Sequence, residues 1–74
     1  MERGHRMRYL VVIEKAENNY AAYIPDLPGC IATAATLDEL QQNIRSAVAM
    51  HLEGLKEDGL PAPEPQTQAE FVEA

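Results

Sequence analysis

Cysteine, histidine and basic residues are scarce in this sequence, and each shortage excludes a class of protein. Cys30 is the single cysteine among 74 residues, so no intramolecular disulfide can form. One cysteine and two distant histidines, His5 and His51, match no zinc-ligand spacing. No apolar run approaches the length of a membrane span, and residues 1–6 carry no apolar export signal. Together with the free thiol, these features predict a cytoplasmic protein.

Positive charge is also in short supply, and it is unevenly placed. Six lysines and arginines stand against twelve acidic residues, and half of the basic residues fall within residues 1–8. In the remainder, three basic residues against eleven acids leave a net charge of −8. Such an acidic body repels phosphate backbones, which argues against direct nucleic-acid binding. It attracts a basic protein instead.

The length permits one small domain with a thin core. The hydrophobic fraction of 46% is ordinary for a globular protein. Since disulfides and zinc are excluded, oligomerisation or partner binding is the expected supplement to stability. We therefore predict a single domain over residues 7–74, preceded by a disordered lead at residues 1–6.

Three strands are predicted in the first half of the chain. Residues 8–15 and 20–24 are rich in β-branched and aromatic side chains, and residues 30–35 carry small ones. Residues 16–19 read as a hairpin loop, since asparagine tolerates positive φ. Pro28 and Gly29 suit the two central positions of a type II turn in the next connection.

A helix is predicted over residues 37–58. Thr36 and Glu39 form a capping-box pattern at its start, and Gly59 is placed to end it in a Schellman motif with Leu60. At helical spacing, the apolar side chains fall on one stripe. That stripe consists of Leu37, Leu40, Ile44, Ala47, Val48, His51, Leu52 and Leu55.

Residues 69–72 hold the one phenylalanine and are a candidate fourth strand. The predicted fold is therefore α+β, a small two-layer β-β-β-α-β domain with an antiparallel sheet and one helix on one face. One helix leaves the opposite face uncovered, so a second copy or another protein must cover it. The predicted partner-binding residues are Leu10, Val12 and Tyr23 on the strands, with Asp26 and Leu27 in the loop that follows.

No catalytic, cofactor-binding or metal-ligating constellation is evident. Cys30 reads as a small buried hydrophobe rather than a reactive thiol. His51 reads as packed against the core, with an interface role as the alternative. Asp26 either bonds its own loop or meets a basic partner.

A nuclease remains the main rival from another class. It would need a cluster of carboxylates, and the candidates are Glu14, Asp26, Asp38 and Glu39, but they show no two-metal signature. The strand tyrosines Tyr9, Tyr20 and Tyr23 would stack bases in a nucleic-acid platform, whereas the surrounding acidity favours core packing.

Three segments resemble the HicB antitoxin family and its partial RNase H-like domain. They are YAAYIPDLPGC at 20–30, TAATLDE at 33–39 and EDGLPAPEP at 57–65, within a likeness that spans residues 7–72. The resemblance implies a β-β-β-α-β unit that binds and neutralises HicA, a small basic mRNA-cleaving toxin. Ala34 and Ala35 stand where many members carry a glycine and an acid. No segment fits the C-terminal DNA-binding domain of full antitoxins, so we expect a solitary HicB-like domain.

The combined reading is a non-enzymatic interaction protein. We expect an antitoxin or antitoxin-like domain that forms homo-oligomers and binds a HicA-like toxin, with no cofactor, no membrane and no direct nucleic-acid contact. An RNase H-like nuclease, degenerate or active, and a purely structural homo-oligomer without a toxin are the alternatives.

Overall fold

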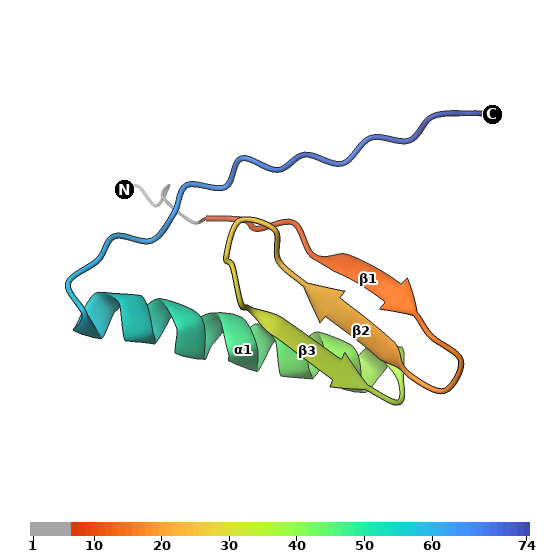
Figure 1. Cartoon of the computed structure of the whole chain (residues 1–74), viewed down its shortest axis with the longest axis horizontal. Coiled ribbons are helices and arrows are strands. Elements are labelled where there is room, and N and C mark those ends of the chain that lie inside the picture. The colour runs from red at the N-terminus through yellow and green to blue at the C-terminus, as the bar shows by residue number, and fades with distance from the viewer. Residues whose placement is uncertain (1–6) are drawn as a thin grey trace.

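A three-stranded antiparallel sheet with one helix against it forms the body of the molecule (Figure 1). This computed structural model describes residues 7–74. The elements are β1 (Val12–Lys15), β2 (Tyr20–Tyr23), β3 (Ile31–Ala34) and α1 (Leu37–Glu57). The sheet order is β1-β2-β3, which confirms the predicted α+β meander. The lead predicted at residues 1–6 lies outside the described residues.

The hairpin between β1 and β2 turns without any left-handed residue. Lys15 pairs with Tyr20, and the N–H of Ala16 donates to the carbonyl of Asn19 at 2.8 Å across the loop. No non-glycine residue in the described chain has a positive φ. The predicted hairpin is therefore confirmed, but the reason given for it, an asparagine at positive φ, is wrong.

Two successive turns connect β2 to β3. The N–H of Leu27 donates to the Ile24 carbonyl, and the N–H of Cys30 donates to the Leu27 carbonyl, both at 3.0 Å. Gly29 has a φ of 85°, as the third residue of a type II turn requires. The predicted turn at Pro28 and Gly29 is confirmed. It folds the side chain of Leu27 inward beneath the sheet.

The N-cap bond of Thr36 and the Schellman end at Gly59 both form as predicted. The hydroxyl of Thr36 accepts from the N–H of Glu39 at 3.2 Å. At the other end Gly59 has a φ of 72°, and the N–H of Leu60 donates to the Leu55 carbonyl at 2.8 Å. This bond closes the Schellman motif.

The core lies between α1 and only part of the sheet. The helix packs on β3 and β2, and no Cα atom of β1 comes within 8 Å of one in α1. Leu40 and Ile44 are the buried helix residues, in the middle of the predicted stripe. Among the described residues, the buried hydrophobic side chains are Ala22, Ile24, Leu27, Cys30, Leu40 and Ile44.

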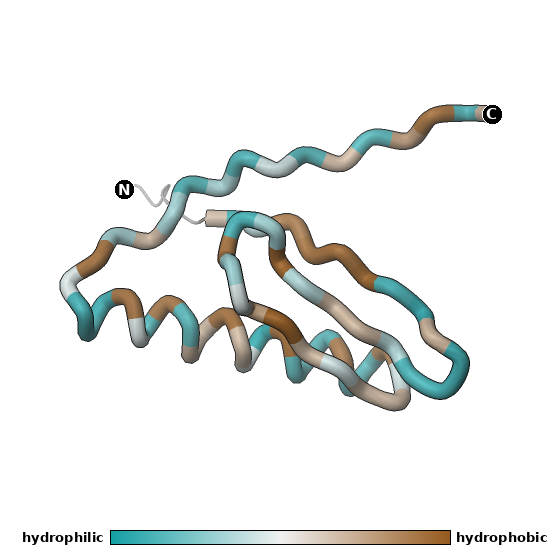
Figure 2. The backbone as a smooth tube through the Cα atoms, in the orientation of Figure 1, coloured by the Kyte–Doolittle hydropathy of each residue, from teal (hydrophilic) through white to brown (hydrophobic). Residues whose placement is uncertain are grey.

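Residues 61–74, here called the C-terminal segment, are extended and leave the body. The chain reverses after α1, passes the N-terminal end of β1 and projects outward (Figure 1). The fourth strand predicted at residues 69–72 is not formed, because this stretch pairs with no strand of its own chain. Phe71 and Val72 are 99% and 85% exposed. Figure 2 shows this hydrophobic stretch near the C-terminal end.

Candidate partner-binding surface

The sheet face turned away from the helix carries a row of apolar side chains. Tyr23 lies directly opposite Val12 on one side and Ile31 on the other, so these three side chains share a face. Leu10 precedes Val12 by two residues and extends the row. Tyr23 is 42% and Ile31 is 60% exposed, while Leu10 and Val12 are half-buried. We name these four residues the outer patch.

The outer patch contains residues that the sequence prediction singled out and one that it missed. Leu10, Val12 and Tyr23 lie together, as expected of a face that α1 does not cover. Ile31 was missed because its strand was read as small residues on both faces. Its pairing with Tyr23 in a simple meander is the signal that would have found it.

Glu14 lies at one end of this same face. It pairs with Ala21, which in turn pairs with Thr33, so the apolar row gives way to a small polar strip with one carboxylate. An apolar centre with an acidic border suits a partner that presents apolar and basic groups together.

Leu27 does not belong to this surface. Its side chain has 0% exposure, at the centre of the buried cluster. The prediction that Leu27 contacts a partner is wrong. The double turn points its side chain into the core, where it holds the loop against the helix and sheet.

Asp26 binds the C-terminal segment of its own chain. One carboxylate oxygen accepts the N–H groups of Gln66 and Thr67, both at 3.0 Å, and the other accepts the Thr67 hydroxyl at 2.9 Å. The N–H of Thr67 is the main cause that holds the pKa of Asp26 below its usual value, against a partial desolvation that raises it. This contact spans some forty residues and replaces the predicted bond of Asp26 to its own loop.

Tyr9 supplies a second attachment for the same segment. Its hydroxyl donates to the carbonyl of Pro63 at 2.6 Å. Burial, with smaller effects from Glu64 and Asp26, raises the pKa of Tyr9, which keeps the phenol protonated as a donor. Tyr9 and Asp26 together fix the course of residues 63–67.

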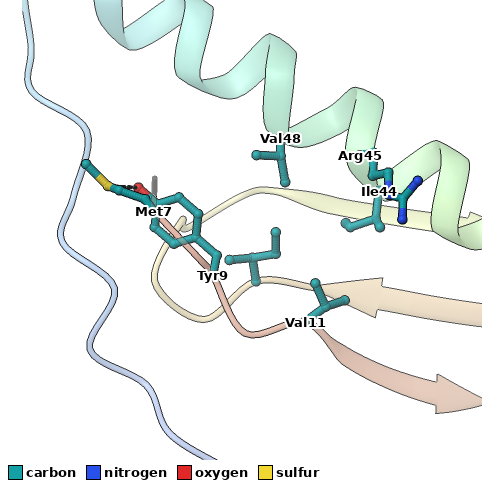
Figure 3. A pocket seen from close by; sticks show the side chains of 7 residues that line it. Met7, Tyr9, Val11, Ile44, Arg45 and Val48 are labelled. Carbon is teal, nitrogen blue, oxygen red and sulfur yellow. Dashed lines mark hydrogen bonds between the residues drawn. The ribbon is translucent and has the colours of Figure 1, made fainter. Parts of the chain in front are cut away.

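An apolar groove runs between the N-terminal part of the chain and α1. Two adjoining cavities of about 220 and 240 Å³ share Val11, Ile44 and Arg45. Figure 3 shows one of them, with Tyr9 and Val11 facing Val48 and Ile44 of the helix. Ile13 and Leu40 line the other. The groove exists because α1 lies over β2 and β3 and leaves the inner side of β1 open.

The remaining candidates take structural positions. Cys30 is buried, as predicted, and burial raises the pKa of its thiol. Tyr9 and Tyr20 pack against the core, which confirms that reading for these two tyrosines but not for Tyr23. His51 is half-buried and lines a shallow hollow beside Ile31 and Met50.

Residues 7–74 contain no group of three acidic, histidine or cysteine side chains close enough to hold a metal ion. Glu14 lies on β1, whereas Asp38 and Glu39 lie in the first turn of α1. Within the same residues, no helix is long and apolar enough to cross a membrane.

Comparison with known proteins assigns this arrangement to a family. The model of the HicB-like antitoxin of bacterial toxin–antitoxin systems matches residues 9–74. A solved HicA3–HicB3 toxin–antitoxin complex contains a chain that is 32% identical, with a TM-score of 0.68 over 81% of this chain and 70% of that one.

Two curated relatives agree in sequence. A UPF0150 protein of Archaeoglobus fulgidus is 43% identical over 72% of this chain and 81% of its own length. A 14.9 kDa protein of Haemophilus phage HP1 is 33% identical over 89% of this chain, which spans 50% of that relative. The chain belongs to the family of HicB-like antitoxins of bacterial toxin–antitoxin systems.

Proposed function

We propose that this chain is a non-enzymatic antitoxin that binds and neutralises a small basic HicA-type toxin. The observation that carries the proposal is the likeness to a chain of the HicA3–HicB3 complex at 32% identity, which covers most of both chains. The toxin would be an mRNA-cleaving protein with a basic RNA-binding face, and neutralisation would consist of covering that face.

The charge distribution supports such a partner. Residues beyond Arg8 carry three basic side chains against eleven acids, a net charge of −8. Opposite charge on a basic toxin would accelerate association and disfavour neutral or acidic competitors. The same charge would repel RNA and DNA from the antitoxin itself.

The outer patch is the surface we assign to the toxin. Tyr23 stands at its centre with 42% of its surface exposed, flanked by Val12 and Ile31. A central aromatic side chain within a ring of smaller apolar contacts is the usual composition of a binding hot spot. We do not assign Asp26 to the toxin contact, because its carboxylate oxygens already accept hydrogen bonds from Gln66 and Thr67.

We also propose that the chain self-associates. Within residues 7–74 the buried hydrophobic side chains number six, a small core for a free monomer, and both the outer patch and the groove beside β1 leave apolar surface exposed. A homo-oligomer would cover one of these surfaces and leave the other for the toxin.

A toxin neutralisation assay tests the proposed function. A purified HicA-type toxin should cleave RNA alone and lose that activity when an equimolar amount of this chain is added. The chain alone, with magnesium, should neither cleave RNA nor shift duplex DNA. Undiminished cleavage by the toxin, or RNA decay caused by the chain alone, contradicts the proposal and favours the nuclease alternative.

A further inference from the structure

The C-terminal segment is fixed up to Thr67 and loses contact with the body beyond it. Asp26 accepts three hydrogen bonds from Gln66 and Thr67, and Tyr9 holds Pro63. Past this attachment, the seven residues 68–74, here called the arm, are all exposed. A specific attachment of this kind sets the direction in which the arm leaves the body (Figure 1).

The arm carries apolar side chains that remain exposed to solvent in a single chain. Phe71 is the one phenylalanine of the sequence and is 99% exposed, next to Val72 at 85%. Both are strong strand formers. A strand of this composition needs an edge to pair with and a surface to cover.

The two edges of the sheet differ in what they offer. At β3 the side-chain amide of Asn43 donates to the Thr33 carbonyl at 3.1 Å, so this edge is partly capped by the helix. The backbone N–H and C=O groups of Thr33 therefore point away from Ala21, its partner on β2. In an antiparallel ladder, paired residues either point these groups at each other or both point them away. The N–H and C=O groups of Ala21 therefore point to the other side, toward Glu14 on β1.

It follows that Ile13 and Lys15 turn their backbone N–H and C=O groups outward from β1. The outer edge of this strand is unpaired in the three-stranded sheet. The side chain of Ile13, 46% exposed, lies beside that edge and lines the apolar groove next to Leu40 and Ile44. An open edge and an apolar groove thus occur side by side.

The arm matches this acceptor in shape and charge. Side chains alternate along a strand, so Phe71 and Glu73 share one face. Each cavity of the groove exceeds 200 Å³, at about 220 and 240 Å³. A dry cavity of about 150 Å³ admits benzene, so the ring of Phe71 fits. Arg45 lines both cavities, and Lys15 ends β1, so the acceptor carries positive charge that complements Glu73.

We propose that the arm is an exchange strand: in a dimer, the arm of each chain pairs with the outer edge of β1 in the other, and Phe71 fills the groove between β1 and α1. The acceptor and the arm are complementary yet do not meet in one chain, because the attachment at Thr67 directs the arm outward. Reciprocal exchange satisfies both copies in one closed twofold dimer. This inference specifies, and rests on, the self-association proposed above, and it leaves the outer patch free for the toxin.

Light scattering on the full chain tests the exchange. The unmodified chain should have twice its 8.2 kDa mass at micromolar concentration. Phe71→Ser should raise the dimer dissociation constant by about 100-fold, since two buried rings are lost. The fold of one chain should be unchanged, because Phe71 makes no packing contact within it. Phe71→Leu should keep the dimer, and Met50→Ser, which alters another exposed hydrophobic residue, on the helix, should leave it intact.

Cysteine cross-linking distinguishes exchange from the alternatives. A Phe71→Cys chain mixed with an Ile13→Cys chain should form a disulfide-linked dimer, while the buried Cys30 stays unreactive. A monomeric wild-type chain overturns both the exchange and the self-association. A dimer that survives Phe71→Ser overturns the exchange alone. A monomer that cross-links internally in the double-cysteine chain also overturns it, because the arm would then pair with its own β1.

Discussion

Asp26 shows how much a single carboxylate organises in this small protein. It binds two backbone N–H groups and one hydroxyl of the C-terminal segment, forty residues further along the chain. The sequence identifies the loop that carries Asp26, but no local pattern indicates which distant residues it will bind. Leu27, its neighbour, was misplaced for the same reason: whether a loop side chain points inward depends on the geometry of both turns.

Attachment of the C-terminal segment should depend on pH through Asp26. Because the folded-state pKa of this carboxyl lies below its usual value, its contribution is fully present above the usual value and is lost as pH falls through the folded pKa. In an NMR titration, the amide signals of Gln66 and Thr67 should move together at that low pKa.

Asp26→Asn is the matched control for this titration. It keeps the side-chain shape and removes the titrating group, so the two amide signals should already differ from wild type at neutral pH and should no longer titrate. If the amide signals of Gln66 and Thr67 did not shift with pH in the wild-type chain, the hydrogen bonds to Asp26 would be contradicted.

The helix is the element that the sequence predicted best, since its determinants are local. Thr36, the apolar stripe and Gly59 each act within a few residues of their own position. The cap and the glycine end are confirmed, and the stripe is confirmed from Leu40 to Leu52, whereas Leu37 at its start is 44% exposed. The fourth strand at residues 69–72 was wrong for a single chain, because strand formation depends on a distant edge. The apolar residues of this stretch can be recognised in the sequence, but the strand edge with which they would pair cannot.

Substitutions at the cap of α1 and in its buried face should lower the free energy of unfolding by different amounts. Thr36→Ala removes the acceptor for the Glu39 N–H and should lower the free energy of unfolding by about 1 kcal/mol. Ile44→Ala, at 5% exposure, should cost about 2–5 kcal/mol through the cavity it leaves. Urea denaturation measures both. Equal losses for the two variants would show that the helix register is wrong.

Two glycines offer a sharper comparison within the same element. Gly54 has helical backbone and nothing within 4 Å of an added Cβ, so Gly54→Ala should raise the free energy of unfolding by up to about 1 kcal/mol. Gly59 also has open space, but its φ of 72° strains any other residue. Gly59→Ala should therefore lower stability by about 1 kcal/mol. Thermal melts of the two variants should shift in opposite directions, and a shared direction would contradict the Schellman end.

At the scale of the whole molecule, one helix cannot cover a sheet on both faces or across its full width. The uncovered outer face was foreseen from the strand composition, and Leu10, Val12 and Tyr23 lie on it. The groove beside β1 was not foreseen, because it arises from where α1 crosses the sheet. The two exposed surfaces give this chain room for two contacts, which we assign to the toxin and to a second copy.

The most direct test of the antitoxin assignment is a calorimetric titration of a purified HicA-type toxin into this chain. We predict saturable binding at micromolar concentrations or below. Tyr23→Ala should raise the dissociation constant by about 30-fold, the effect of losing an interface hot spot of roughly 2 kcal/mol. Gln42→Ala, which truncates an exposed residue of α1 that lines none of the grooves described above, should bind as the wild type does. Absence of binding by the wild-type chain, or equal binding by the wild-type and Tyr23→Ala chains, would contradict the account.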